Sequence, residues 1–285
     1  MILITGASGT VGTETVRALQ AKSADFRVGV RSAEKAAQLG AGWVEFDWDR
    51  PATHAAALRG VETLFLLPPV SEEQAAQGKA LVGAAKRAGV RRIVKLSVIG
   101  ADTEPGITIG RMHREVERAM QGSGVAWTIL RPTFFMQNFV NFYGLDPRAD
   151  HTVYMPWGDG KASWVDARDV GEVAATVLTA RGHEGKVYDL TGPEALGAQE
   201  VLTILGGALG KGYAYVDVPE DAARQAMLDM RMPAWMVDGF MELNGLIKNG
   251  YAAGVAPGVR QVLGRAPRAV RDWAEALAAG VSQKS

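Results

Sequence analysis

Short apolar runs alternate with longer segments of helical period over the first 130 residues. The runs cover residues 2–5, 26–30, 43–46, 63–67, 93–97 and 127–130. Segments between them, such as 11–21 and 72–88, place alanine, leucine and valine at helical spacing with charged residues between. Strands that are apolar throughout are typical of a parallel sheet covered by helices on both faces. The pattern therefore predicts an α/β fold built on a doubly wound parallel sheet.

The pattern becomes less regular after residue 132. A stretch rich in glycine, proline and aspartate covers 144–160, and one strand candidate, 186–190, precedes mostly helical segments. We therefore predict a sheet-bearing domain over residues 1–150 and a smaller, mostly helical C-terminal lobe over residues 151–285. Part of the second segment is expected to return to the sheet of the first.

The composition excludes several classes of function. The 31 basic residues balance the 31 acidic ones, so the chain lacks the basic excess expected of a protein that binds nucleic acid or an anionic membrane. It has no cysteine and only four, widely spaced histidines, so neither disulfides nor a metal site is expected. The first residues show no signal-peptide pattern and no membrane span. We expect a cytoplasmic monomer or homodimer.

A glycine-rich loop follows the first predicted strand directly and opens a helix at Val11. It reads Gly6-Ala7-Ser8-Gly9-Thr10-Val11-Gly12. A strand, a glycine turn and a helix N-terminus together direct backbone N–H groups and the positive helix end toward a pyrophosphate. Gly6 allows the tight turn, Gly9 lets the phosphates approach, and Gly12 lets helix and strand pack closely. The loop predicts a Rossmann-type dinucleotide-binding domain; an ordinary glycine-rich turn is the alternative.

The end of the second predicted strand indicates which dinucleotide is bound. An acidic residue there would accept hydrogen bonds from a ribose 2′-hydroxyl, whereas an arginine would pair with a 2′-phosphate. Asp25 precedes this strand and therefore lies at its other end, whereas Arg31, Ser32 and Lys35 follow it. This basic, hydroxyl-bearing group favours NADPH over NADH. In the alternative interpretation, Arg31 and Lys35 are solvated residues at a helix start.

Further segments over most of the chain add to the pattern of the glycine loop GASGTVG. They are VRSAEK, FDWD, Leu67-Pro68-Pro69, SGVAWTILRP, the run from Phe134 to Asn138, WVDARDV (164–170) and YDLTGPEA (188–195). Together they resemble the NmrA-like atypical short-chain dehydrogenases/reductases. That family includes NAD(P)H-dependent quinone reductases, triphenylmethane-dye reductases, azoreductases and nucleotide-sensing regulators without turnover. The resemblance implies that further residues join the loop in binding NADP(H), namely Asp47, Leu67, Pro68, Pro69, His113 and Phe135.

The larger dehydrogenase group uses a Tyr-x-x-x-Lys pair, which this chain lacks. By resemblance, Glu117 fixes the register, so His113 stands at the lysine position and Ile109 at the tyrosine position. Ser97, at the end of the fifth predicted strand, stands where the group has its serine. His113 and Ser97 are therefore the catalytic candidates. A structural i, i+4 pair between His113 and Glu117 is the alternative for the histidine.

The missing acid narrows the chemistry. Reduction of an unactivated ketone needs a proton at oxygen, and a general acid contributes roughly two to four orders of magnitude there. Quinones, hydroxy-azo dyes and triarylmethane cations accept hydride readily and take a proton from water or a modest donor. The sequence predicts an NADPH-dependent reductase of such flat acceptors. A non-catalytic NADP-sensing regulator is the alternative. Reduction of a carbon–carbon double bond, as in isoflavone-reductase relatives, is disfavoured because His113 stands where those enzymes have a lysine.

By resemblance, the C-terminal lobe contributes the site for a small aromatic or conjugated substrate. Aromatic side chains suit flat acceptors because rings stack. Trp164 is expected to be core, and Phe135 and Tyr154 suit core and site equally well. The substrate-binding candidates are Phe134, Phe135, Met136, Asn138, Tyr154 and Trp157.

Overall fold

The computed structural model describes residues 1–282, which form two compact units. Unit 1 consists of residues 1–132, 167–190 and 258–264, and unit 2 of residues 133–166, 191–257 and those from 265 onward. The boundary predicted after residue 150 falls inside unit 2. The chain leaves the sheet at Pro132, and the apolar residues that follow, such as Phe139, pack into the core of unit 2.

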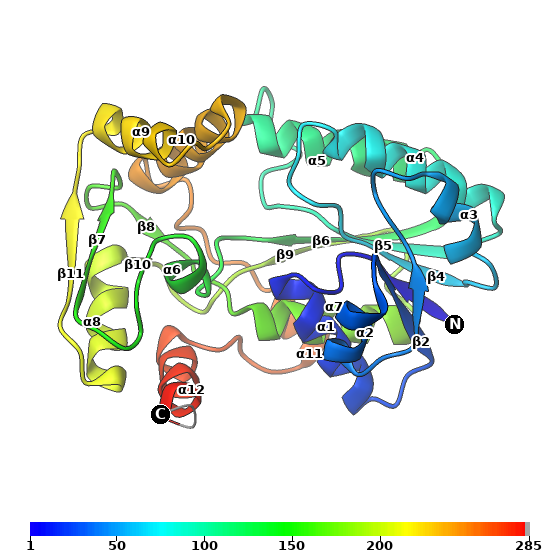
Figure 1. Ribbon diagram of the computed structural model, residues 1–285, viewed down its shortest axis with the longest axis horizontal. Helices are drawn as coiled ribbons and strands as arrows, with labels where there is room; N and C mark the ends of the chain where they lie inside the picture. Colours follow the sequence, from blue (N-terminus) through cyan, green and yellow to red (C-terminus); the bar gives the residue numbers. More distant parts are fainter. Residues whose placement is uncertain (283–285) are drawn as a thin grey trace. The chain divides into compact units, whose positions relative to one another are not determined.

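Unit 1 is built on a seven-stranded parallel sheet in the order β3-β2-β1-β4-β5-β6-β9 (Figure 1). Every strand predicted for the first 130 residues is present, with ends shifted by at most two residues. β9 pairs in parallel with β6, which confirms the predicted return of the later segment to the sheet. The order and the parallel pairing define a Rossmann-type α/β fold. The strands are β1 (Ile2–Ile4), β2 (Phe26–Val30), β3 (Trp43–Glu45), β4 (Thr63–Leu66), β5 (Arg92–Leu96), β6 (Ala126–Pro132) and β9 (Lys186–Leu190).

Helices cover both faces of this sheet (Figure 1). One face carries α1 (Thr10–Ala21), α7 (Ala167–Thr179) and α11 (Gly258–Leu263). The other carries α3 (Ala52–Ala57), α4 (Gln74–Arg87) and α5 (Thr108–Gln121), while α2 (Ala33–Leu39) follows β2. Leu64, Leu81 and Val116 are fully buried between the sheet and the second group of helices.

Unit 2 combines helices with two small sheets. The helices are α6 (Asn138–Asn141), α8 (Ala198–Leu209), α9 (Glu220–Asp229), α10 (Ala234–Lys248) and α12 (Val270–Ser282). One sheet pairs β7 (His151–Met155) with β11 (Tyr213–Asp217), and the other pairs β8 (Lys161–Ala162) with β10 (Leu196–Gly197). The sequence pattern did not predict these four strands, because each finds its partner across a long stretch of chain.

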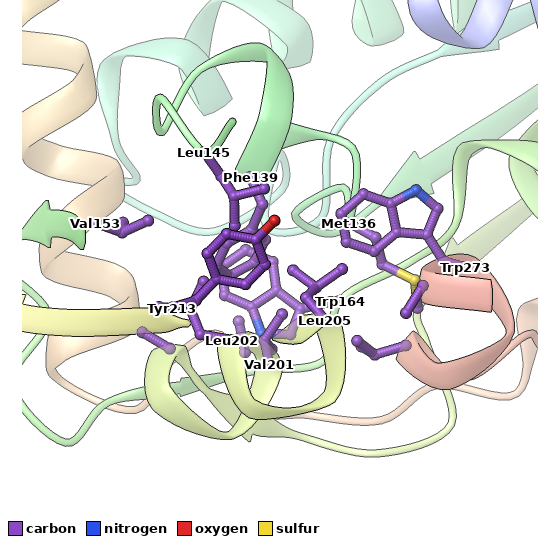
Figure 2. Packing of buried hydrophobic residues seen from close by; sticks show 14 of the residues in the cluster. Met136, Phe139, Leu145, Val153, Trp164, Val201, Leu202, Leu205, Tyr213 and Trp273 are labelled. Atoms are coloured by element: carbon purple, nitrogen blue, oxygen red, sulfur yellow. The ribbon is translucent and has the colours of Figure 1, made fainter. Parts of the chain in front are cut away.

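The core of unit 2 combines aromatic and aliphatic side chains (Figure 2). Trp164 is 1% exposed and its Nε1 donates to the Leu196 carbonyl oxygen at 2.8 Å, so the expectation that it is core is confirmed. Trp157 and Met136, predicted to bind substrate, are fully buried in the same cluster. The Trp157 Nε1 donates to Asn244 Oδ1 at 2.8 Å. We therefore reassign Trp157 and Met136 to packing, because neither side chain has a surface that a ligand could reach.

No helix in residues 1–282 is both long enough and apolar enough to span a membrane.

Candidate functional site

The glycine loop has the backbone shape that a bound pyrophosphate requires. Gly6 adopts φ +64°, and a Cβ there would lie 2.7 Å from the Leu67 carbonyl oxygen. A Cβ on Gly12 would lie 2.1 Å from the Gly6 carbonyl oxygen, so only glycine fits where α1 crosses the loop. Gly9 is the exposed N-cap of α1, and a Cβ there would meet only the Gly6 carbonyl oxygen, at 3.5 Å. The loop is therefore closed toward the protein and open toward a ligand.

The loop lies at the point where the strand order reverses. β1 neighbours β4, and the helices that follow these two strands, α1 and α4, cover opposite faces of the sheet. Thr5 joins the strand ends, because its Oγ1 donates to the Phe65 carbonyl oxygen at 2.8 Å and accepts from Leu67 N–H at 3.0 Å. Pro68 is buried and Pro69 is exposed just beyond. In open α/β sheets dinucleotides bind at this switch point, so the residues present fit a dinucleotide.

No acidic residue lies in the first turn of α1, a helix that the structure describes completely. A carboxylate there would compete with a phosphate for the positive end of the helix. Ser8 and Thr10 are exposed on the loop, whereas Ala7 is buried and Val11 packs into the core. The charge at this helix start therefore also suits an anion.

The three candidate residues after β2 have different roles, because Ser32 caps a helix whereas Arg31 and Lys35 carry positive charge. Ser32 caps α2, since its Oγ accepts a hydrogen bond from Lys35 N–H at 3.4 Å. Arg31 is exposed at the carboxyl end of β2, and Lys35 lies one turn into α2. Asp25 lies at the opposite end of β2, where its Oδ2 is 3.6 Å from the α-ammonium group of Met1. The part of the chain that the structure describes contains no ion-pair partner for Arg31, so its guanidinium is available.

Asp47, after β3, is engaged within its own turn. Its Oδ1 accepts from Asp49 N–H at 3.2 Å and its Oδ2 from Arg50 Nε at 3.3 Å. The His54 Nε2 lies 2.9 Å from the Asp47 carbonyl oxygen, which can only accept. These contacts shape the loop, and a role of Asp47 in cofactor binding stays a prediction.

A buried polar chain joins β5, α5 and α4. Lys95 is fully buried in the middle of β5, and its Nζ lies 2.8 Å from His113 Nδ1 and 3.0 Å from the Leu96 carbonyl oxygen. The other ring nitrogen of His113, Nε2, lies 2.9 Å from the side-chain amide of Gln74. His113 and Gln74 are 8% and 1% exposed.

A second buried network begins at Ser97, directly after the end of β5. The Ser97 hydroxyl donates to Glu117 Oε1, and Arg131 binds the same carboxylate with Nε at 3.1 Å and Nη2 at 2.7 Å. Arg131 Nη1 also lies 2.6 Å from Asp102 Oδ2. Glu117 is thus held by Arg131 and Ser97, while the ring nitrogens of His113 face Lys95 and Gln74. The alternative of a His113–Glu117 pair is therefore wrong.

The two basic groups of the first network are strongly perturbed. Burial lowers the pKa of Lys95 to about 7, with the charge of Glu117 opposing the shift and that of Arg131 adding to it. Burial, and then the charge of Lys95, lowers the pKa of His113 well below its usual value. The imidazole is therefore neutral at physiological pH, and the proton that titrates near neutrality belongs to Lys95.

Sequence reasoning missed Lys95, Gln74 and Arg131. Lys95 carried a usable signal, because a lysine inside an apolar strand of a sheet covered on both faces must be buried and needs a partner. Nothing in the sequence around Gln74 and Arg131 indicates a role, because each is identified only by the residue that it contacts in the folded protein.

The remaining candidates lie in unit 2. Tyr154 is 62% exposed on β7. Phe134 packs its ring edge-on against Trp164, with the centroids 5.9 Å apart, and Phe135 forms a backbone bridge with Val165. Asn138 begins α6. Phe134, Phe135 and Asn138 are each partly exposed, so the candidates with surface available to a ligand are these three and Tyr154.

The chain is similar to known proteins whose names describe NAD(P)H-dependent reductases and quinone oxidoreductases. An NAD(P)H azoreductase of Xenophilus azovorans is 42% identical over 282 residues, which cover 98% of each chain. Quinone oxidoreductase 2 of Escherichia coli K12 is 32% identical over 246 residues, covering 84% of this chain and 85% of that protein. An Escherichia coli NADPH-dependent quinone oxidoreductase, solved with NADPH, matches with a TM-score of 0.85 and 27% identity over 97% of this chain and 99% of its own. Residues 1–266 match the model of the NmrA-like family, and the chain therefore belongs to that family.

Proposed function

We propose that this protein is an NADPH-dependent reductase that transfers hydride to a flat conjugated acceptor such as an azo dye or a quinone. The observation that carries the proposal is the glycine loop at the switch point of the sheet, which fits a dinucleotide in backbone shape and in charge. The relatives named azoreductase and quinone oxidoreductase support the class of acceptor.

Residues of unit 1 would hold the cofactor by two kinds of contact. The exposed loop residues Ser8, Gly9 and Thr10 present the start of α1 to the pyrophosphate. Arg31, with Lys35 beside it, meets the 2′-phosphate with a charge-assisted bond. When bound, the reduced nicotinamide supplies the hydride.

The protein contributes orientation and a dry environment rather than a strong acid. The Ser97 hydroxyl donates a hydrogen bond to Glu117. We therefore assign Ser97 to holding that carboxylate and not to proton transfer. His113 is left as the proton donor, and its lowered pKa leaves little of its doubly protonated form at neutral pH, so it supplies protons poorly. A weak donor suffices for acceptors whose conjugation stabilises the added electron pair, and not for an unactivated ketone.

NADPH oxidation, followed by absorbance, tests the proposal against a quinone, a hydroxy-azo dye, a triarylmethane dye and an enone. We expect steady turnover with at least one of the first three. Tight NADPH binding with no oxidation against the whole panel would contradict the proposal and favour the NADP-sensing regulator.

Tyr154 is the most exposed of the acceptor-binding candidates. Tyr154→Ala should raise the acceptor KM without changing the dissociation constant of NADPH, because a stacking surface is lost while unit 1 is untouched. Tyr251→Ala is the matched control, since that tyrosine is 78% exposed in the same unit. Equal changes in both variants would show that Tyr154 does not bind the acceptor.

A further inference from the structure

The chain Lys95–His113–Gln74 obeys a strict hydrogen-bond rule. A neutral imidazole has one N–H donor and one acceptor nitrogen, so its two neighbours cannot both donate to it or both accept from it. An ammonium group only donates, whereas an amine can also accept. A side-chain amide offers either its oxygen or its nitrogen after a half-turn.

An amine could also donate to Nδ1, but an aliphatic amine is a poorer N–H donor and a better acceptor than an imidazole. Two arrangements are therefore favoured. If Lys95 is an ammonium, it donates to His113 Nδ1, the ring hydrogen is on Nε2, and Nε2–H donates to the Gln74 amide oxygen. If Lys95 is an amine, Nδ1–H donates to its nitrogen, and the Gln74 amide nitrogen donates to Nε2. Lys95 donates to the Leu96 carbonyl oxygen in both arrangements.

We propose that Lys95 is a positioning residue that decides which ring nitrogen of His113 carries the proton. In passing from the first arrangement to the second, the pair loses one proton to water, the Nε2–H bond breaks and an Nδ1–H bond forms. The ring holds one proton throughout, and no group other than Lys95 changes charge. This inference rests on the proposed function only for its catalytic meaning: while Lys95 is charged, His113 can give its Nε2 proton to an acceptor and take a proton from the Lys95 ammonium at Nδ1, so the ring stays neutral.

The surroundings place the exchange near neutral pH. The largest influence on Lys95 is burial within β5, which favours the amine. Glu117 on α5 favours the ammonium and Arg131 on β6 opposes it, which leaves the pKa of Lys95 at about 7. On the other side, Gln74 on α4 is uncharged and adapts to either tautomer by rotating its amide.

Nitrogen NMR on protein labelled with ¹⁵N in the histidine rings tests the proposal, because the shifts of Nδ1 and Nε2 distinguish the tautomers. Between pH 6 and pH 9 we expect the protonated nitrogen of His113 to change from Nε2 to Nδ1 in the unmodified protein. His54 is the internal control, since its Nε2 faces a carbonyl oxygen that can only accept, which fixes the tautomer of its neutral ring. His113→Asn assigns the signal. One unchanged tautomer across the whole range would overturn the proposal.

Two variants separate Lys95 from other causes. Lys95→Met keeps the size of the side chain and removes its charge, so the exchange should disappear while the far-ultraviolet circular dichroism is retained. Lys86→Met, an exposed position on α4, should leave the exchange unchanged. If Lys95→Met does not fold, the titration of the unmodified protein still decides the question. An exchange that persists in folded Lys95→Met would assign it to another group and overturn the proposal.

Kinetics then connect the tautomer with turnover. If the protein reduces a conjugated acceptor, kcat should fall above the midpoint of the exchange in the unmodified protein, with a flat profile in Lys95→Met. The NMR measurement needs neither cofactor nor acceptor. An exchange without turnover would therefore contradict the proposed function alone, and turnover without an exchange would contradict this inference alone.

Discussion

Arg31 is the residue on which the choice of cofactor depends. A charge-assisted bond to a phosphate contributes roughly 1.5–3 kcal/mol, which is about ten- to hundredfold in affinity. Arg31→Ala should therefore weaken NADPH by about that factor and leave NADH nearly unchanged. Dissociation constants for both cofactors, at one fixed salt concentration, check this. Lys22→Ala, exposed at the far end of α1, is the control, and equal weakening of both cofactors by Arg31→Ala would show that no 2′-phosphate is bound there.

Glu117 shows how much burial changes the value of an ion pair. Its side chain and that of Arg131 are 4% and 8% exposed, so Glu117→Ala leaves a buried guanidinium with one partner fewer. The expected loss is about 3–5 kcal/mol in the free energy of unfolding. Glu115, on the same helix, pairs with Lys79 at the surface, and Glu115→Ala should cost less than about 1 kcal/mol. Urea unfolding measures both, and similar losses would show that the Glu117 network adds little.

At the scale of single elements, the close approach of α1 to the loop before it is the critical feature. Gly12→Ala places a Cβ 2.1 Å from the Gly6 carbonyl oxygen, so the helix or the loop must move. We expect NADPH and NADH to weaken together, by tenfold or more, which separates this variant from Arg31→Ala. Gly83→Ala in α4 is the control, because its Cβ would meet only the flexible end of Arg87 at 3.4 Å. Unchanged binding by Gly12→Ala would mean that the loop does not hold the cofactor.

The sequence predicted elements best where the pattern is local. The strands of unit 1 are apolar runs bounded by turns, so the sequence pattern predicted all seven. The strands of unit 2 are paired across long stretches of chain, as β7 is with β11. Their existence depends on a partner that no window of sequence contains.

At the scale of the whole molecule, Lys95 makes stability depend on pH. Its pKa is about 7 in the folded protein and 10.5 for an ordinary lysine, as in the unfolded chain. Between these pH values the unfolded chain therefore binds more protons than the folded one. The free energy of unfolding should therefore rise with pH, by about 1.4 kcal/mol per unit within this window. Lys95→Met should remove this rise.

Urea unfolding at pH 7, 8 and 9 measures the slope. His113 does not interfere, because its lowered pKa affects stability only below its ordinary value of 6.5. Tyrosines with raised pKa, such as Tyr143, act above their ordinary value of 10. Lys86→Met should keep the slope of the unmodified protein, and an equal slope in Lys95→Met would show that the burial of Lys95 is not its origin.

The sequence by itself determined the features that depend on residues close together in the chain. The glycine loop, the strands of the sheet and the helix that follows each are local patterns, and the sequence also placed Arg31 at the correct end of its strand. The tertiary structure decided which side chains meet. Lys95, His113 and Gln74 lie 18 and 39 residues apart and touch only because β5, α5 and α4 are neighbours. The pKa of Lys95 follows from the same burial, and burial is a property of the assembled sheet and helices, not of any segment alone.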